Sequence, residues 1–86
     1  MKEYNIRFVV SAAKEFRALP AEIKARIGEA VDSLSQNPRP SGVRKLREHE
    51  GLYRIRVGHY RVIYEIDDQT RSILVTRVRH RREAYR

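Results

Sequence analysis

The sequence predicts an α+β domain with the element order βααβββ, in which a helical hairpin packs on one face of a small antiparallel sheet. Apolar residues recur at helical spacing between residues 11 and 34. After residue 52, alternating apolar and polar residues are interrupted by short polar turns, which is typical of consecutive antiparallel strands. The chain has 86 residues without an internal repeat or linker, so a single domain over residues 1–86 is expected.

The first half of the chain predicts one strand and two helices. Tyr4, Ile6 and Phe8 alternate with other residues as in a half-buried strand. Ser11 is expected to be the N-cap of a short first helix, and Pro20 suits the first position of the second. The second helix carries one apolar stripe, consisting of Ile23, Ile27, Ala30, Val31 and Leu34. The segment NPRPSG at residues 37–42 ends this helix in a loop.

The second half predicts three strands, at residues 52–57, 60–66 and 72–79. Gly58-His59 fits a two-residue hairpin loop of type II′, with glycine at the first central position. Residues 67–71 form a longer polar turn. This hairpin loop predicts that Arg56 lies opposite Arg61 and that Arg54 lies opposite Ile63, on the face of the sheet away from the helices.

The last strand contributes further arginines whose face depends on its register. Leu74, Thr76 and Val78 share one parity and are expected to face the helices. Arg77, Arg79 and Arg81 share the other parity and would then join Arg54, Arg56 and Arg61 on the open face. The turn at residues 67–71 leaves this register open.

Charge and composition point to a polyanionic partner. The net charge is +8, and residues 39–86 carry thirteen Lys/Arg against six Asp/Glu, a net charge of +7. Such a basic excess favours nucleic acid as the partner. The absence of cysteine excludes disulfides and thiolate metal sites, and no apolar run reaches the ~20 residues of a membrane span. We therefore expect a cytoplasmic protein with no metal, no cofactor and no membrane contact.

Catalysis, if present, has to use the arginines and the residues near the C-terminus. The sequence has no Ser-His-Asp set and no Gly-rich phosphate loop. RNA cleavage needs a base for the 2′-OH, stabilisation of the phosphorane and a proton for the leaving oxygen. His80 lies between two arginines that favour its neutral form, and neighbouring cations also favour the phenolate of Tyr85.

The stretches KLRE at residues 45–48, LYRIRVGHYRVIYEI at 52–66 and VTRVRHRREAYR at 75–86 resemble the RelE/ParE superfamily of toxin–antitoxin toxins, and the tail is more similar to the RelE branch. This resemblance implies a toxin that cleaves mRNA in the ribosomal A site. By the same resemblance Arg54, Arg56 and Arg61 bind the scissile phosphate, Tyr85 takes the 2′-OH proton and Arg81 helps to protonate the leaving group. Lys45, Arg77 and Arg79 complete the expected phosphate-binding set.

Alternatives remain open within this resemblance. Two positions that are lysine in the best-known branch are arginine here, and arginine acts by stabilising charge. His80 competes with Tyr85 as the general base, since some branches use a histidine near this point. A ParE-like inhibitor of DNA gyrase without nuclease activity is the alternative function, and a plain RNA-binding module is a third. The implied partners are a cognate antitoxin, the ribosome and mRNA, and the complex is expected to bind operator DNA through the antitoxin.

Overall fold

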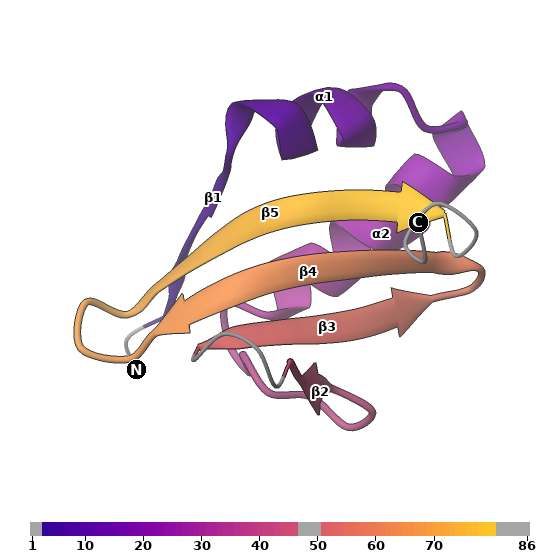
Figure 1. Ribbon diagram of the computed structural model, residues 1–86. Coiled ribbons are helices and arrows are strands. Elements are labelled where there is room, and N and C mark those ends of the chain that lie inside the picture. Colours follow the sequence, from indigo (N-terminus) through magenta and orange to yellow (C-terminus); the bar gives the residue numbers. More distant parts are fainter. Residues whose placement is uncertain (1–2, 47–50, 81–86) are drawn as a thin grey trace.

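The computed structural model describes residues 3–46 and 51–80 and confirms the α+β architecture. Two helices cover one face of a five-stranded sheet, with α1 running along β5 (Figure 1). Neither helix in the described part of the chain is long and apolar enough to cross a membrane. The elements are β1 (Asn5–Phe8), α1 (Val10–Arg17), α2 (Ala21–Ser33), β2 (Arg44–Lys45), β3 (Leu52–Val57), β4 (Tyr60–Asp67) and β5 (Ser72–His80).

The sheet is mixed, with the strand order β1-β5-β4-β3-β2. Strands β3 to β5 are antiparallel as predicted, and β2 also pairs antiparallel with β3. Because β1 pairs with β5 in parallel, the prediction of a purely antiparallel sheet is wrong at this edge. Because the helices carry the chain from β1 across the sheet to β2 at the other edge, no hairpin turn sets the direction of β1. The two-residue strand β2 was not predicted.

The β3–β4 hairpin has the predicted turn and register. Gly58 has φ 61°, and Arg71 is the one non-glycine residue with positive φ in the described part of the chain, so His59 has negative φ as a type II′ turn requires. Arg56 pairs with Arg61 in this register.

A β-bulge in β5 corrects the predicted parity of the last strand. Ile63 pairs with Arg77 and the next residue of β4, Tyr64, pairs with Val75, so that Thr76 is the extra residue. The Thr76 hydroxyl donates to the Ile63 carbonyl oxygen at 3.2 Å. Because the bulge shifts the alternation, Leu74 lies opposite Glu65 on the open face, and the prediction that it faces the helices is wrong.

The helix starts differ slightly from the predicted ones. Helix α1 begins at Val10 after the N-cap Val9, which makes no side-chain capping bond, so Ser11 lies inside the helix and is not its cap. Pro20 is the N-cap of α2, one position before the predicted one, and it brings the required φ of −56°.

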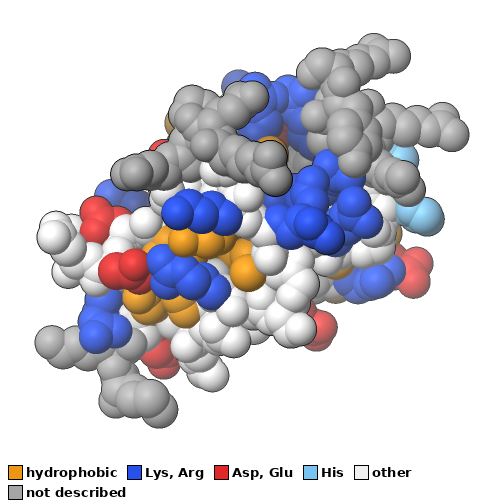
Figure 2. All heavy atoms as spheres, turned by 60° about the horizontal axis from the view of Figure 1, so that its bottom comes forward, with side chains coloured by type: hydrophobic (Ala, Val, Ile, Leu, Met, Phe, Trp, Pro, Cys, Tyr) orange, Lys and Arg blue, Asp and Glu red, His pale blue; other side chains and the backbone are white. Residues whose placement is uncertain are grey.

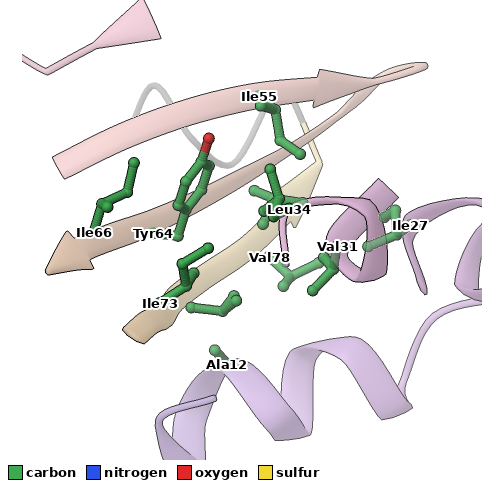
Figure 3. Packing of buried hydrophobic residues seen from close by; sticks show 11 residues of the cluster. Ala12, Ile27, Val31, Leu34, Ile55, Tyr64, Ile66, Ile73 and Val78 are labelled. Atoms are coloured by element: carbon green, nitrogen blue, oxygen red, sulfur yellow. The ribbon is translucent and has the colours of Figure 1, made fainter. Parts of the chain in front are cut away.

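The core lies between the helices and the sheet, and side chains of both converge there (Figure 3). From the stripe predicted for α2, the helix residues Ile27 and Val31 and the C-cap residue Leu34 are buried in this core. Because both helices use this face, no helix among residues 3–46 and 51–80 covers the opposite face of β2 to β5. The sheet contributes Ile55, Val62, Tyr64, Ile66, Ile73, Val75 and Val78 to the core.

Arg39, in the loop after α2, forms hydrogen bonds with Tyr53 of β3 and with Asp68 in the turn after β4. Its guanidinium forms two hydrogen bonds with the Asp68 carboxylate, at 3.2 and 2.9 Å, and donates to the Tyr53 hydroxyl at 3.2 Å. The hydrogen bonds from Arg39 and then from Tyr4 hold the pKa of Asp68 below its usual value. Tyr64 is buried beside this cluster and donates to the Pro38 carbonyl at 2.8 Å. Burial raises the pKa of Tyr64 to about 12.

Candidate nucleic-acid interface

The open face of the sheet carries arginines in two neighbouring rows across the strands. Directly paired residues point to the same face, and the register pairs Arg56 with Arg61 and Arg61 with Arg79. The adjacent row runs from Arg44 through Arg54 and Ile63 to Arg77. We call the six residues Arg44, Arg54, Arg56, Arg61, Arg77 and Arg79 the arginine face.

Figure 2 shows Lys and Arg side chains gathered on this side of the molecule, next to a hydrophobic patch. Ile63 lies within the second row, and Leu52 and Leu74 flank Glu65 in the row beyond it. All three apolar side chains are half-buried. The face therefore combines a dense positive charge with a small apolar area, and the one acidic residue of these three rows is Glu65.

The row of Arg56, Arg61 and Arg79 is the densest part of the face. Arg61, on the central strand, is only 5% exposed, whereas Arg56 is exposed. A small hollow lies between these two arginines and the hairpin tip at Gly58. Cations in direct cross-strand opposition repel each other, and a bound phosphate between them would replace that repulsion by charge-assisted hydrogen bonds.

Arg79 forms a hydrogen-bonded ion pair with a residue of helix α1, which packs on the opposite face of the sheet. Its Nε donates to Glu15 of α1 at 2.9 Å, and the other oxygen of that carboxylate accepts from the Val78 backbone N–H at 2.9 Å. The Arg79 side chain is 36% exposed and that of Glu15 is 24% exposed. Sequence reasoning missed Glu15, because its contact joins residues 64 positions apart.

His80 lies on the other side of the sheet from the arginine face. It pairs with Tyr60, two residues from the buried pair Val62–Val78, so its side chain shares the helical side. Its ring packs edge-on against Tyr60 with ring centres 5.1 Å apart. Both side chains line a half-open groove of about 300 Å³ together with Leu19 and Pro20. The register therefore does not bring His80 together with the arginines.

Lys45 is also separated from the arginine face. It pairs with Tyr53, whose ring stacks on Tyr64 on the helical side. The neighbouring residue Arg44 takes the position opposite Arg54 instead. Sequence reasoning missed Arg44 because a two-residue strand carries no alternation from which its pairing or parity could be inferred.

Arg81 and Tyr85 lie outside the described residues. No group of three or more His, Asp or Glu side chains suited to a metal ion occurs in residues 3–46 and 51–80. The arginine face can bind an anion, because guanidinium groups in neighbouring rows can donate hydrogen bonds to phosphate oxygens.

Comparison with known proteins identifies relatives of this chain and of its fold. A family model described as the ParE toxin of the type II toxin–antitoxin system, parDE, matches residues 6–85. A toxin named RelG from Mycobacterium tuberculosis is 37% identical over 84 residues, covering 96% of this chain and 97% of that protein.

Solved structures agree with this relationship. The archaeal RelE–RelB complex from Pyrococcus horikoshii OT3 superposes with a TM-score of 0.82 at 30% identity, covering 92% of this chain and 96% of that chain. The toxin–antitoxin complex RelBE2 from Mycobacterium tuberculosis superposes with a TM-score of 0.79 at 34% identity, covering 92% of this chain and 99% of that chain.

Proposed function

Because this chain belongs to the ParE toxin family, within its RelE branch, and is the toxin of a type II toxin–antitoxin system, we propose that it is an endoribonuclease that cleaves mRNA in the ribosomal A site. The observation that carries the proposal is the arginine face, in particular the direct opposition of Arg56 and Arg61. The planar guanidinium of arginine binds phosphate oxygens well. Without an anionic ligand, two cations in direct cross-strand opposition only destabilise the sheet.

The proposed reaction is attack of the 2′-oxygen on the adjacent phosphorus. The new P–O2′ bond forms as the P–O5′ bond breaks, which yields a 2′,3′-cyclic phosphate and a 5′-OH. Arg54, Arg56 and Arg61 hold the scissile phosphate and stabilise the charge of the phosphorane. Arg44, Arg77 and Arg79 extend the contact along the RNA backbone.

Two proton transfers complete the proposed reaction. Tyr85 takes the proton of the 2′-OH, and Arg81 assists protonation of the leaving 5′-oxygen. We prefer Tyr85 to His80 as the base because His80 shares the helical side of the sheet with Tyr60. A base must come within hydrogen-bond reach of the proton that it removes.

We further propose that this chain acts in the cytoplasm and that a cognate antitoxin binds it there. The solved complexes of RelE relatives with RelB proteins support an antitoxin as the partner. An antitoxin that offers acidic side chains would neutralise the arginine face, or it would cover the helices. We propose that the complex binds operator DNA through the antitoxin.

The test is primer extension on an mRNA in translating ribosomes, with wild type, Arg61→Ala and Arg81→Ala. We expect new cuts inside codons with wild type that are lost in both variants. Arg17→Ala removes the same charge from an exposed position of α1 and should cut like wild type. Because Arg61 is buried, its variant also needs an unchanged circular dichroism spectrum.

The name ParE in the description of the family model favours one second candidate, a ParE-like toxin. We propose for this candidate that it inhibits DNA gyrase without nuclease chemistry. If wild type produces no cuts and translation proceeds normally, while DNA supercoiling by gyrase falls, the nuclease proposal fails and this candidate replaces it. Cuts that persist in Arg61→Ala and Arg81→Ala would instead refute the assignment of the chemistry to this face.

A further inference from the structure

Glu15 of α1 contacts β5 from the helical side, and its carboxylate binds one residue of the arginine face, Arg79. Strand β1 pairs with β5 over Ser72–Val75, and beyond that point Glu15 takes the place of a neighbouring strand by accepting from the Val78 N–H. The second oxygen of the same carboxylate accepts from Arg79 Nε. One side chain of α1 thus satisfies an edge amide and fixes an arginine of the opposite face.

We propose that Glu15 is a positioning residue, which holds Arg79 so that the guanidinium can donate to an RNA phosphate beside Arg61. The inference rests on the proposed function and extends it by a residue outside the arginine face. In the register, Arg79 is the direct neighbour of Arg61, which in turn neighbours Arg56. A phosphate bound at this row would therefore lie within reach of Arg79.

The arginine geometry makes simultaneous binding of the carboxylate and a phosphate possible. A guanidinium has one Nε donor and four donors on its two terminal nitrogens. Glu15 binds at Nε and is the one hydrogen-bond partner of the Arg79 guanidinium in the described part of the chain. The terminal nitrogens thus remain available on a side chain that is 36% exposed. A side chain that is already ordered loses less conformational freedom when the RNA arrives.

Lysine would behave differently at this position, which gives the inference a sharp test. A lysine has all three of its donors on one ammonium nitrogen, so Glu15 and the phosphate would have to share that single atom, and the carboxylate would neutralise the charge that the phosphate needs. If Glu15 positions Arg79, its carboxylate helps RNA binding when arginine is present and hinders it in Arg79→Lys. A carboxylate that merely repels RNA would hinder binding in both cases.

The experiment measures binding of a single-stranded RNA whose 2′-OH groups are methylated, so that it cannot be cleaved. Glu15→Gln keeps an oxygen for the Val78 N–H but removes the carboxylate from Arg79. Glu29→Gln is the matched control, since it removes the same charge from an exposed position of α2. Both changes are made in wild type, in R79A and in R79K, and the thermal midpoint of each protein is recorded.

We expect Glu15→Gln to bind RNA about tenfold more weakly than Glu29→Gln in the wild-type background. In R79A the two variants should bind equally, and in R79K Glu15→Gln should bind more tightly than Glu29→Gln. A structural role of Glu15 alone would lower the thermal midpoint without this reversal.

Equal binding by Glu15→Gln and Glu29→Gln in the wild-type background would overturn the inference and leave Glu15 as a cap of the sheet edge. Tighter binding by Glu15→Gln there would overturn it in favour of competition between Glu15 and RNA. The two proposals fail separately. The inference fails alone if wild type cuts mRNA but the variants show no reversal. The nuclease proposal fails alone if the reversal is seen but no cuts are made.

Discussion

Arg56 gives the most direct test of the proposal that the arginine face binds an anion. Removal of its charge should raise the stability of the free protein and weaken its binding of RNA. Arg56 is exposed and lies opposite the buried Arg61. Like charges in direct cross-strand opposition destabilise a sheet by roughly 0.2–1 kcal/mol. Arg56→Gln keeps most of the side-chain length and removes one of the two charges, so the free protein should become more stable.

The expected magnitude follows from the size of the domain. For a domain of this length a gain of ~0.5 kcal/mol raises the thermal midpoint by about 2–4 °C. The gain should shrink at high salt, because charges near the surface are screened over ~10 Å at ~0.1 M salt. Binding of single-stranded RNA should weaken. The negative slope of log K for association against log salt should become shallower by about 0.7, the value for one lost phosphate contact.

The assay is thermal unfolding at low and high salt together with a salt titration of RNA binding. Arg17→Gln is the control, because it removes an equal charge from α1. The reasoning is refuted if Arg56→Gln melts at or below Arg17→Gln at low salt, or if its salt slope equals that of the control. The first result would mean that the opposition carries no repulsion, and the second that RNA does not contact Arg56.

Two further predictions concern the fold. Burial raises the pKa of Tyr64 to about 12, so the folded state favours the neutral phenol. A pKa raised from ~10 to ~12 corresponds to about 3 kcal/mol of folding stability. This stability should be fully present below pH ~10 and lost between pH ~10 and ~12, because the unfolded state ionises first. Tyr64→Phe should lack this alkaline loss in unfolding measurements across that range, and an identical loss in the variant would assign it to another group. Leu34 is fully buried against the sheet, and Leu34→Ala should cost about 2–5 kcal/mol; a loss below ~1 kcal/mol in chemical denaturation would contradict its place in the core.

The local patterns of the sequence were sufficient for much of the candidate site. A two-residue turn with glycine first determines which residues of β3 and β4 face each other, so the opposition of Arg56 and Arg61 follows from Gly58-His59 alone. The helical stripe through Ile27, Val31 and Leu34 likewise predicted which side of α2 is buried. In both cases the information lies within a few residues of chain.

Features that depend on distant residues were decided by the tertiary structure. The parallel pairing of β1 and the position of Arg44 depend on how the two helices connect one edge of the sheet to the other. The bulge at Thr76 depends on how β5 pairs with β4 while it also packs into the core. That bulge puts Leu74 on the open face while keeping Arg77 and Arg79 there. The sequence by itself determined the two helices, the strands β1, β3, β4 and β5, the hairpin register and the positive charge. The structure decided that His80 and Lys45 lie on the other side and that Glu15 reaches Arg79, because pairing register and contacts across 64 residues arise only when the whole chain packs.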